Sequence, residues 1–308
     1  MAEETSSGSR SPLIILVQAV RAFSFTASMV PVLVGAMFAL SYEGEVRWGL
    51  FPLVVVCSLL FHAGTNLVSD YFDFQRGVDR KDTLGSSGVL VDGLLLPKQV
   101  LNAGLLMFAL GFLLGLILVY YRGAPIFWLG VIGILGGFFY TGKPIGYKYI
   151  ALGDLLVFTL MGPLMVIGSY YVLTGTFHTH VLYVSLPIGF LVTAILHANN
   201  LRDIVHDTQA NVRTLANLFG LKAAKIEYHL LVVAAYLSVV MMVVGGVVKP
   251  WVLIVFLSLP PAVKNMKAIN GAQQNNEAAI ALIDVQTAQH HLLFGILLTV
   301  GLILSAVL

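Results

Sequence analysis

The chain has 308 residues, of which 58% are hydrophobic and only 10% are charged, whereas about 25% of residues are charged in a typical soluble domain. A soluble protein of this size cannot bury so much apolar surface, so we predict an all-α polytopic membrane protein. The net charge of +2 gives no reason to expect a nucleic-acid partner, and the single cysteine, Cys57, excludes an intrachain disulfide.

The amino-terminal residues differ in composition from the rest of the chain. Residues 1–11 are polar and rich in serine, which is typical of a disordered tail. They lack the basic stretch, short apolar run and cleavage site of a signal peptide. We expect residues 12–308 to form one membrane-embedded domain, whose oligomeric state the sequence does not determine.

Nine apolar runs approach the length of about 20 residues that a membrane helix needs. They lie at about 12–40, 47–73, 98–121, 124–141, 150–173, 179–203, 219–247, 250–268 and 286–307. The eighth is the weakest, because Pro260 and Pro261 interrupt it and predict a kink. Similar polar stretches after the second and sixth runs suggest that helices 1–4 and 5–8 form a pseudo-repeat, with helix 9 added.

Lysine and arginine residues are distributed unevenly between the predicted helices. With a cytoplasmic amino terminus, thirteen of them lie on the inside, while Arg47, Arg122 and Lys249 lie outside. Because positive charge is enriched in cytoplasmic loops, we expect an integral protein of the cytoplasmic (inner) membrane. Both polar stretches then emerge on the cytoplasmic face.

The polar stretches have related patterns, Asn66-x3-Asp70-x2-Asp73 and Asn199-x3-Asp203-x3-Asp207. Steps of three or four residues place each set on one face of a helix, and ionisable groups at membrane depth point to function. Carboxylates that share a cavity repel one another unless cations are present. Oxygen ligands suit Mg²⁺, which binds through carboxylates and substrate phosphates, so we predict two Mg²⁺ ions bridged by a diphosphate.

Basic residues near these motifs are candidates for binding the diphosphate, and three of them (Arg21, Lys143 and Arg202) lie closest to the helix ends that face the expected cavity. The candidates are Arg21, Arg76, Arg80, Lys81, Lys143, Lys148, Arg202 and Arg213. The histidines show no spacing typical of a transition-metal site, and we expect them to pack between helices or at the interface.

A metal-bound diphosphate in a cavity open to lipid suggests an isoprenyl diphosphate as substrate. Metal ions stabilise the charge of a departing diphosphate, and the allylic carbon then becomes carbocation-like. Aromatic faces stabilise such a cation without attacking it. Aromatic residues near the appropriate helix ends are Tyr71, Phe72, Phe138, Phe139 and Tyr140.

At these residues the chain resembles the UbiA superfamily of intramembrane prenyltransferases, over roughly residues 17–300. Within it the chain looks most like the MenA branch, the 1,4-dihydroxy-2-naphthoate polyprenyltransferases of menaquinone synthesis. The segments that carry this likeness are 66–79, Gly85-Ser-Ser-Gly88, Tyr140-Thr-Gly-Lys-Pro144 with 147–175, and 199–207 with Arg213-Thr-Leu-Ala. Two positions depart from the branch: Asn211-Val212 replaces a Gly-Lys pair, and Asp154 stands where Glu is commoner.

The resemblance implies a nine-helix bundle with a cytoplasmic-side cavity and Mg²⁺-dependent prenyl transfer to an aromatic acceptor. It implies that Asp70 and Asp203 act in catalysis and that Lys143 and Tyr140 close the pocket. The implied metal ligands are Asn66, Asp70, Asp73, Asp203 and Asp207, with Asp79 and Asn199 supporting the metal–diphosphate site.

Other functions fit parts of this pattern. Relatives with another acceptor, such as 4-hydroxybenzoate, a glycerol-phosphate lipid or haem, share the metal motifs. A transporter also carries carboxylates within membrane helices, but inverted repeats are expected there. Here both motifs end on the same side of the membrane, which favours the transferase.

Overall fold

The computed structural model describes residues 11–81, 83, 85–273 and 277–308. The predicted polar tail therefore lies outside the described residues, except for Ser11. The Ser11 hydroxyl accepts a hydrogen bond from the backbone N–H of Ile14 (3.4 Å) and caps α1, Pro12–Ala19. Within the described ranges the regular structure is helical, apart from one isolated β-bridge between Ile150 and Arg213. This confirms the predicted all-α class.

In the described residues, eight helical stretches are long and apolar enough to cross a membrane, while α5, with 15 residues, is shorter. The main helices are α2 (Thr26–Glu43), α3 (Phe51–Gln75), α4 (Pro97–Arg122), α5 (Ala124–Phe138), α6 (Gly153–Thr159), α7 (Met165–Thr174), α8 (Thr179–Arg202), α10 (Leu215–Val244), α11 (Leu259–Gly271) and α12 (Ile283–Val307). Shorter elements are α9 (Ile204–Gln209), the 3₁₀ segments Ala22–Phe25, Trp48–Leu50, Tyr147–Tyr149, Pro250–Ser258 and Glu277–Ile280, and a π-helical segment, Leu160–Leu164, that joins α6 to α7.

Local sequence signals account for several helix boundaries. Proline occupies the first turn of α3, α4 and α5, where its missing N–H costs no helical hydrogen bond. Thr214 caps α10 in a capping box with Asn217. Gly123 has φ 74° between α4 and α5, a conformation that glycine adopts without a steric penalty.

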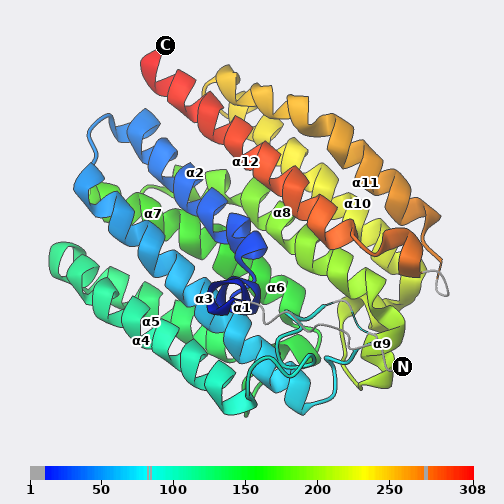
Figure 1. The fold of residues 1–308 in the computed structure, drawn as a ribbon. Helices are drawn as coiled ribbons and strands as arrows, with labels where there is room; N and C mark the ends of the chain where they lie inside the picture. The colour runs from blue at the N-terminus through cyan, green and yellow to red at the C-terminus, as the bar shows by residue number, and fades with distance from the viewer. Residues whose placement is uncertain (1–10, 82, 84, 274–276) are drawn as a thin grey trace, which may run out of the picture.

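Two predicted helices differ from the structure. The run 12–40 is broken, because Arg21 adopts a left-handed conformation (φ 51°) between α1 and the segment that leads into α2. Helix α1 is seen nearly end-on in Figure 1, so it lies across the direction of α2 and α3. In the eighth run, Pro260 and Pro261 fall in the first turn of α11 and begin a helix rather than kink one.

The centre of the bundle is α8, which packs against α2, α6, α10 and α12. In the most apolar 18-residue stretch of α8, 67% is buried inside the bundle, whereas the buried share of the corresponding stretch of α4 is 22%. Large apolar side chains on α4, among them Leu106 and Leu113, are exposed, as expected for a lipid-facing helix. The loop after α3 and helix α9, which follows α8, lie at the same end of the bundle (Figure 1), which agrees with the predicted placement of the two motifs on one face.

The close approach of α8 to the π-helical segment yields a prediction about stability. A Cβ at Gly162 would lie 2.5 Å from the Cα of Gly189, so Gly162→Ala forces two backbones apart at a cost of about 1–3 kcal/mol. We expect this variant to unfold at a lower temperature in detergent. Gly130→Ala on α5 is the control, because a Cβ there meets nothing within 4 Å; equal melting temperatures for the two variants would contradict the packing.

Candidate functional site

Both motifs meet at one cavity of about 440 Å³ inside the bundle. Its wall is polar at the end where α3 and α8 finish and apolar elsewhere. The polar end includes Arg21, Asn66, Asp79, Lys148, Asn199, Asp203 and Asp207. The apolar part includes Val54, Leu118, Ile126, Leu164 and Val172. Along α3 the wall extends from Val54 to Ser69, about 22 Å at 1.5 Å per residue.

The carboxylates of the first motif lie just behind this wall and are paired with basic residues that line it. Asp70 accepts a hydrogen bond from the guanidinium of Arg21 in an ion pair. Lys148 Nζ lies 2.7 Å from Asp73 Oδ2, and the Tyr149 hydroxyl donates to Asp73 Oδ1 over 2.8 Å. Asp70 and Asp73 are 2% and 1% exposed. The left-handed turn at Arg21 therefore places its guanidinium against Asp70 of the first motif.

Asn66 and Asp79 lie on the cavity wall itself. The Asn66 amide nitrogen donates to the backbone carbonyl of Val20 (2.9 Å) and to Ser24 Oγ (3.1 Å), so these contacts do not use its amide oxygen. Burial, reinforced by the negative charge of Asp73, raises the pKa of Asp79 to about 7. A carboxyl group with this pKa is only partly ionised at neutral pH, and further positive charge beside it lowers the pKa and favours the carboxylate.

In the second motif, Arg202 holds its neighbours in place. It donates to both oxygens of Asp203 (2.7 and 2.8 Å) and to Asn199 Oδ1 (2.6 Å), and it pairs with Asp284 (2.8 Å). Arg202 is only 3% exposed and is absent from the cavity wall. These contacts commit its guanidinium to Asp203 and Asn199, and so favour a positioning role for Arg202 over the predicted contact with diphosphate.

Asp207 faces the cavity one helical turn beyond Asp203. Burial, together with the charge of Asp203, raises its pKa to about 7 in spite of nearby Lys148. In the described part of the chain, carboxylates outnumber basic groups at this end of the cavity. A set of oxygen donors with excess negative charge fits hard divalent cations such as Mg²⁺.

Several of the predicted basic residues lie away from the cavity. Lys143 is exposed, and a tight turn in which Gly146 N donates to Gly142 O carries the chain onward to Lys148. Of these two candidate lysines, the structure thus brings Lys148 to the cavity wall and not the favoured Lys143. Burial alone would lower the pKa of Lys148, but the charge of Asp73 outweighs burial and raises that pKa well above its ordinary value.

The three basic residues after α3 also lie outside the cavity wall. Lys81 and Arg76 are exposed. The Arg76 guanidinium stacks 3.9 Å above the ring of Tyr149, a cation–π contact that supports the tyrosine bound to Asp73. Arg80 contacts His206 Nδ1 (3.4 Å) and Gln209 Oε1 (3.3 Å) on α9, and so links the two loops.

Aromatic residues line the cavity beside Lys148. Tyr140 was predicted there, and its ring lies 5.3 Å from that of Tyr147, which also lines the wall. The Lys148 ammonium is 5.9 Å from the Tyr140 ring centroid. The other four predicted aromatic residues are not part of the described wall: Tyr71, Phe72, Phe138 and Phe139.

A polar group that the sequence did not assign to the site is His62. It lines the cavity, with Nδ1 2.6 Å from Ser28 Oγ and Nε2 3.1 Å from Ser24 Oγ. Its position one helical turn before Asn66 was the available signal, because residues four apart share a face. Its partners come from α2 and the segment before it, so their presence was not visible in the local pattern.

The Gly/Ser-rich turn closes over the second motif. A Cβ at Gly85 would lie 3.5 Å from Asp203 Oδ2, and Gly85 and Ser86 both line the cavity. The Gln18 side chain donates to the backbone carbonyl of Ser87 over 2.6 Å. Helix α1 therefore anchors this turn from the side of the first motif.

Comparison with known proteins agrees with this architecture. Residues 28–283 match the UbiA prenyltransferase family. The chain is 36% identical to 1,4-dihydroxy-2-naphthoate octaprenyltransferase of Bacillus subtilis (strain 168), over 94% of this chain and 93% of that protein. It is 33% identical to human (Homo sapiens) UbiA prenyltransferase domain-containing protein 1, over 94% and 83% respectively.

Two solved structures share the fold at low sequence identity. A UbiA homolog from Archaeoglobus fulgidus bound to GPP and Mg²⁺ superposes with a TM-score of 0.62 and 13% identity, over 92% of this chain and 99% of that one. A structure described for digeranylgeranylglyceryl phosphate synthase gives a TM-score of 0.64 and 18% identity, over 94% and 98%.

The contacts of Arg202 predict a strong dependence of stability on its guanidinium. Arg202→Lys keeps the charge but loses the two-pronged contact with Asp203, and leaves two partly buried carboxylates poorly paired. A hydrogen bond to a charged group contributes about 1.5–3 kcal/mol, so we expect a clear fall in melting temperature. Arg76→Lys is the matched control at an exposed site; a loss in Arg202→Lys no greater than in this control would refute the positioning role.

Proposed function

This chain belongs to the UbiA prenyltransferase family, and from that premise we propose that it transfers a polyprenyl group from an isoprenyl diphosphate to 1,4-dihydroxy-2-naphthoate. It is an integral membrane enzyme with apolar helices long enough to span the bilayer. We further propose that it lies in the cytoplasmic membrane with its amino terminus in the cytoplasm, where the polar end of the cavity opens.

One observation supports the donor most directly: a single cavity is lined by Asp and Asn side chains at one end and by apolar side chains along the rest. An isoprenyl diphosphate divides in the same way, into a charged head and an apolar tail. The apolar part of the wall lies among helices whose outer faces are themselves apolar. A tail that leaves the cavity therefore enters lipid at little cost.

The diphosphate end of the proposed site uses the two motifs. Asn66, Asp203 and Asp207 would hold Mg²⁺ directly, with Asp70 and Asp73 close behind and Asn199 and Asp79 in support. Bound Mg²⁺ supplies the positive charge that stabilises a departing diphosphate. The high pKa values of Asp79 and Asp207 support this assignment, since they mark a place where added positive charge is favourable.

Among the described residues, Arg21 and Lys148 are the arginine and lysine that line the cavity. We assign them the diphosphate oxygens, because each is held by a motif carboxylate and so has little conformational freedom to lose on binding. Tyr140 and Tyr147 offer ring faces beside them. These faces would stabilise the allylic carbon as its C–O bond lengthens.

The proposed reaction at the acceptor does not require a strong base. The allylic C–O bond breaks and its electron pair leaves with the diphosphate. The ring carbon that bears the acceptor carboxylate forms the new C–C bond, and the carboxylate departs as CO₂ while its bonding electrons return to the ring. No proton is removed at that carbon. Hydrogen bonds from Ser24, Ser28 and His62 therefore suffice to orient the acceptor.

The deciding assay is incorporation of labelled polyprenyl diphosphate into 1,4-dihydroxy-2-naphthoate by the full chain in detergent or bilayers. We expect turnover with Mg²⁺ and none with chelator. Asp207→Asn should lower the rate by about 100-fold or more, while the exposed Asp92→Asn should not. Preferred turnover of 4-hydroxybenzoate, a glycerol-phosphate lipid or haem would overturn the proposed acceptor, and a normal rate in Asp207→Asn would overturn the metal assignment.

A second prediction concerns the acceptor wall. His62→Ala removes a side chain that we assign to the acceptor and that also holds the Ser24 and Ser28 hydroxyls. Because a hydrogen bond contributes about 1 kcal/mol, we expect the KM for the naphthoate to rise about fivefold while the KM for the prenyl diphosphate stays the same. His229→Asn, on α10 and away from the cavity wall, serves as the control. Equal increases in both KM values would show that His62 supports the fold of the cavity instead of binding the acceptor.

A further inference from the structure

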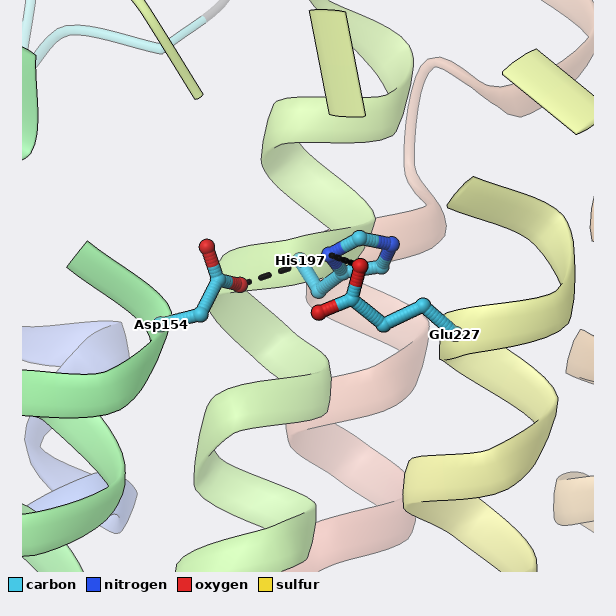
Figure 2. A group of neighbouring side chains, drawn as sticks. All are labelled: Asp154, His197 and Glu227. Carbon is cyan, nitrogen blue, oxygen red and sulfur yellow. Dashed lines mark hydrogen bonds and ion pairs between the residues drawn. The ribbon is translucent and has the colours of Figure 1, made fainter. Parts of the chain in front are cut away.

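Three ionisable side chains that the proposed reaction does not use lie together beneath the second motif. Asp154 comes from the first turn of α6, His197 from α8 and Glu227 from α10. Figure 2 shows Asp154 and Glu227 approaching His197 from opposite sides, with dashed lines from the imidazole to both. In the described residues this cluster is separate from the cavity wall.

We propose that Asp154, His197 and Glu227 form a second metal site, which binds a divalent transition metal such as Zn²⁺ and is distinct from the magnesium–diphosphate site. Imidazole favours transition metals, whereas the all-oxygen motifs favour Mg²⁺. The two sites therefore differ in ligand chemistry as well as in position.

The distances between the possible ligand atoms suit one small ion. His197 Nδ1 lies 3.3 Å from Asp154 Oδ1 and 3.8 Å from Glu227 Oε2, and all three ligand atoms lie within 4.8 Å of one another. Tetrahedral ligands at the Zn–N and Zn–O distances of about 2.0–2.1 Å are separated by about 3.3 Å. A modest contraction of the group therefore produces a coordination shell.

The hydrogen bonding of His197 directs a lone pair at the two carboxylates. Its Nε2 lies 2.9 Å from the backbone carbonyl of Ala224, which can only accept, so Nε2 carries the hydrogen. In the neutral ring Nδ1 is then an unprotonated acceptor that faces two more acceptors. Metal-binding histidines characteristically donate their other N–H to a carbonyl or carboxylate in this way.

The net charge of the cluster and its access to solvent favour a bound metal ion over a proton on His197. A proton on Nδ1 would leave one net negative charge among three side chains, two of which, His197 and Asp154, are buried. A divalent ion neutralises both carboxylates, which matters where the dielectric is low. Glu227 is 29% exposed, so an ion can enter from its side and keep a water molecule as fourth ligand.

The site also has a structural link to the cavity. Asn200 lines the cavity, and its amide donates to Asp154 Oδ2 over 3.4 Å. Asn199 and Arg202 lie on the same helix just beyond His197, and Asp203 follows as its C-cap. A metal ion that joins α6, α8 and α10 would therefore hold the end of α8 that presents the second motif.

The test uses the tag-free full chain in detergent, stripped with chelator and then kept in excess Mg²⁺, with Co²⁺ as the spectroscopic probe. We expect one equivalent of Co²⁺ with visible absorption, displaced by Zn²⁺, and a higher melting temperature when the ion is bound. Glu227→Gln preserves shape at a half-exposed position and should weaken binding at least about tenfold. Glu45→Gln, at an exposed loop position, should leave binding unchanged.

The outcome does not depend on the proposed function. Asp207→Asn should bind Co²⁺ as the unaltered protein does, although we expect it to be inactive in prenyl transfer. Failure to bind Co²⁺, or binding that is as tight in Glu227→Gln as in the unaltered chain, would overturn the proposal. The cluster would then hold a proton on His197 Nδ1 in place of a metal ion. Binding lost in Asp207→Asn and kept in Glu227→Gln would assign the ion to the motifs and overturn it as well.

Discussion

Buried ion pairs between motif carboxylates and three basic residues hold the polar end of this bundle together. Arg21 precedes α2 and pairs with Asp70 on α3; Lys148 follows α5 and pairs with Asp73; Arg202 joins Asp203 on its own helix end to Asp284 on α12. A buried ion pair contributes little more to stability than well-packed apolar side chains of similar volume would. Removing one partner is nevertheless costly, because it leaves an uncompensated buried charge. The helices that carry these groups must therefore end at the same place.

This constraint explains departures from regular helix in the same region. The left-handed residue at Arg21 ends α1 and turns the guanidinium toward Asp70. The turn after α5 brings Lys148, together with Tyr149, onto Asp73. In both places the backbone leaves the helix where a charged side chain must reach a carboxylate, and strained or irregular backbone of this kind concentrates at functional sites.

The same pairs separate two roles among the charged groups. Arg202 and Asp284 lock the second motif in position, whereas Arg21 and Lys148 pair behind the wall and still line the cavity. The motif carboxylates are therefore held rigidly, with the cationic side chains of Arg21 and Lys148 at the cavity wall, and this arrangement suits a highly charged ligand. The central, mostly buried α8 carries this group at its end, and it also carries His197 within the bundle. One helix thus links the cavity to the second cluster of ionisable residues.

The sequence alone determined the class of protein, the approximate helices and the two Asp/Asn motifs, because apolar length and helical spacing are local properties. The resemblance of those motifs to a family extended this to prenyl transfer. Tertiary structure decided what each charge does. Lys143 and Lys148 look alike in sequence, and only the turn between them brings Lys148 to the site. Arg202 looks like a ligand-binding residue in the sequence, but in the structure Asp203, Asn199 and Asp284 occupy its guanidinium.

The break at Arg21, the wall formed by Ser24, Ser28 and His62, and the Asp154–His197–Glu227 cluster depend on contacts between distant segments. No local pattern encodes such contacts, because His197 and its two acidic neighbours lie 43 and 30 positions apart along the chain. The physical reason is general for a helical bundle: periodicity along one helix states which face is polar, but the packing of several helices selects which polar groups meet.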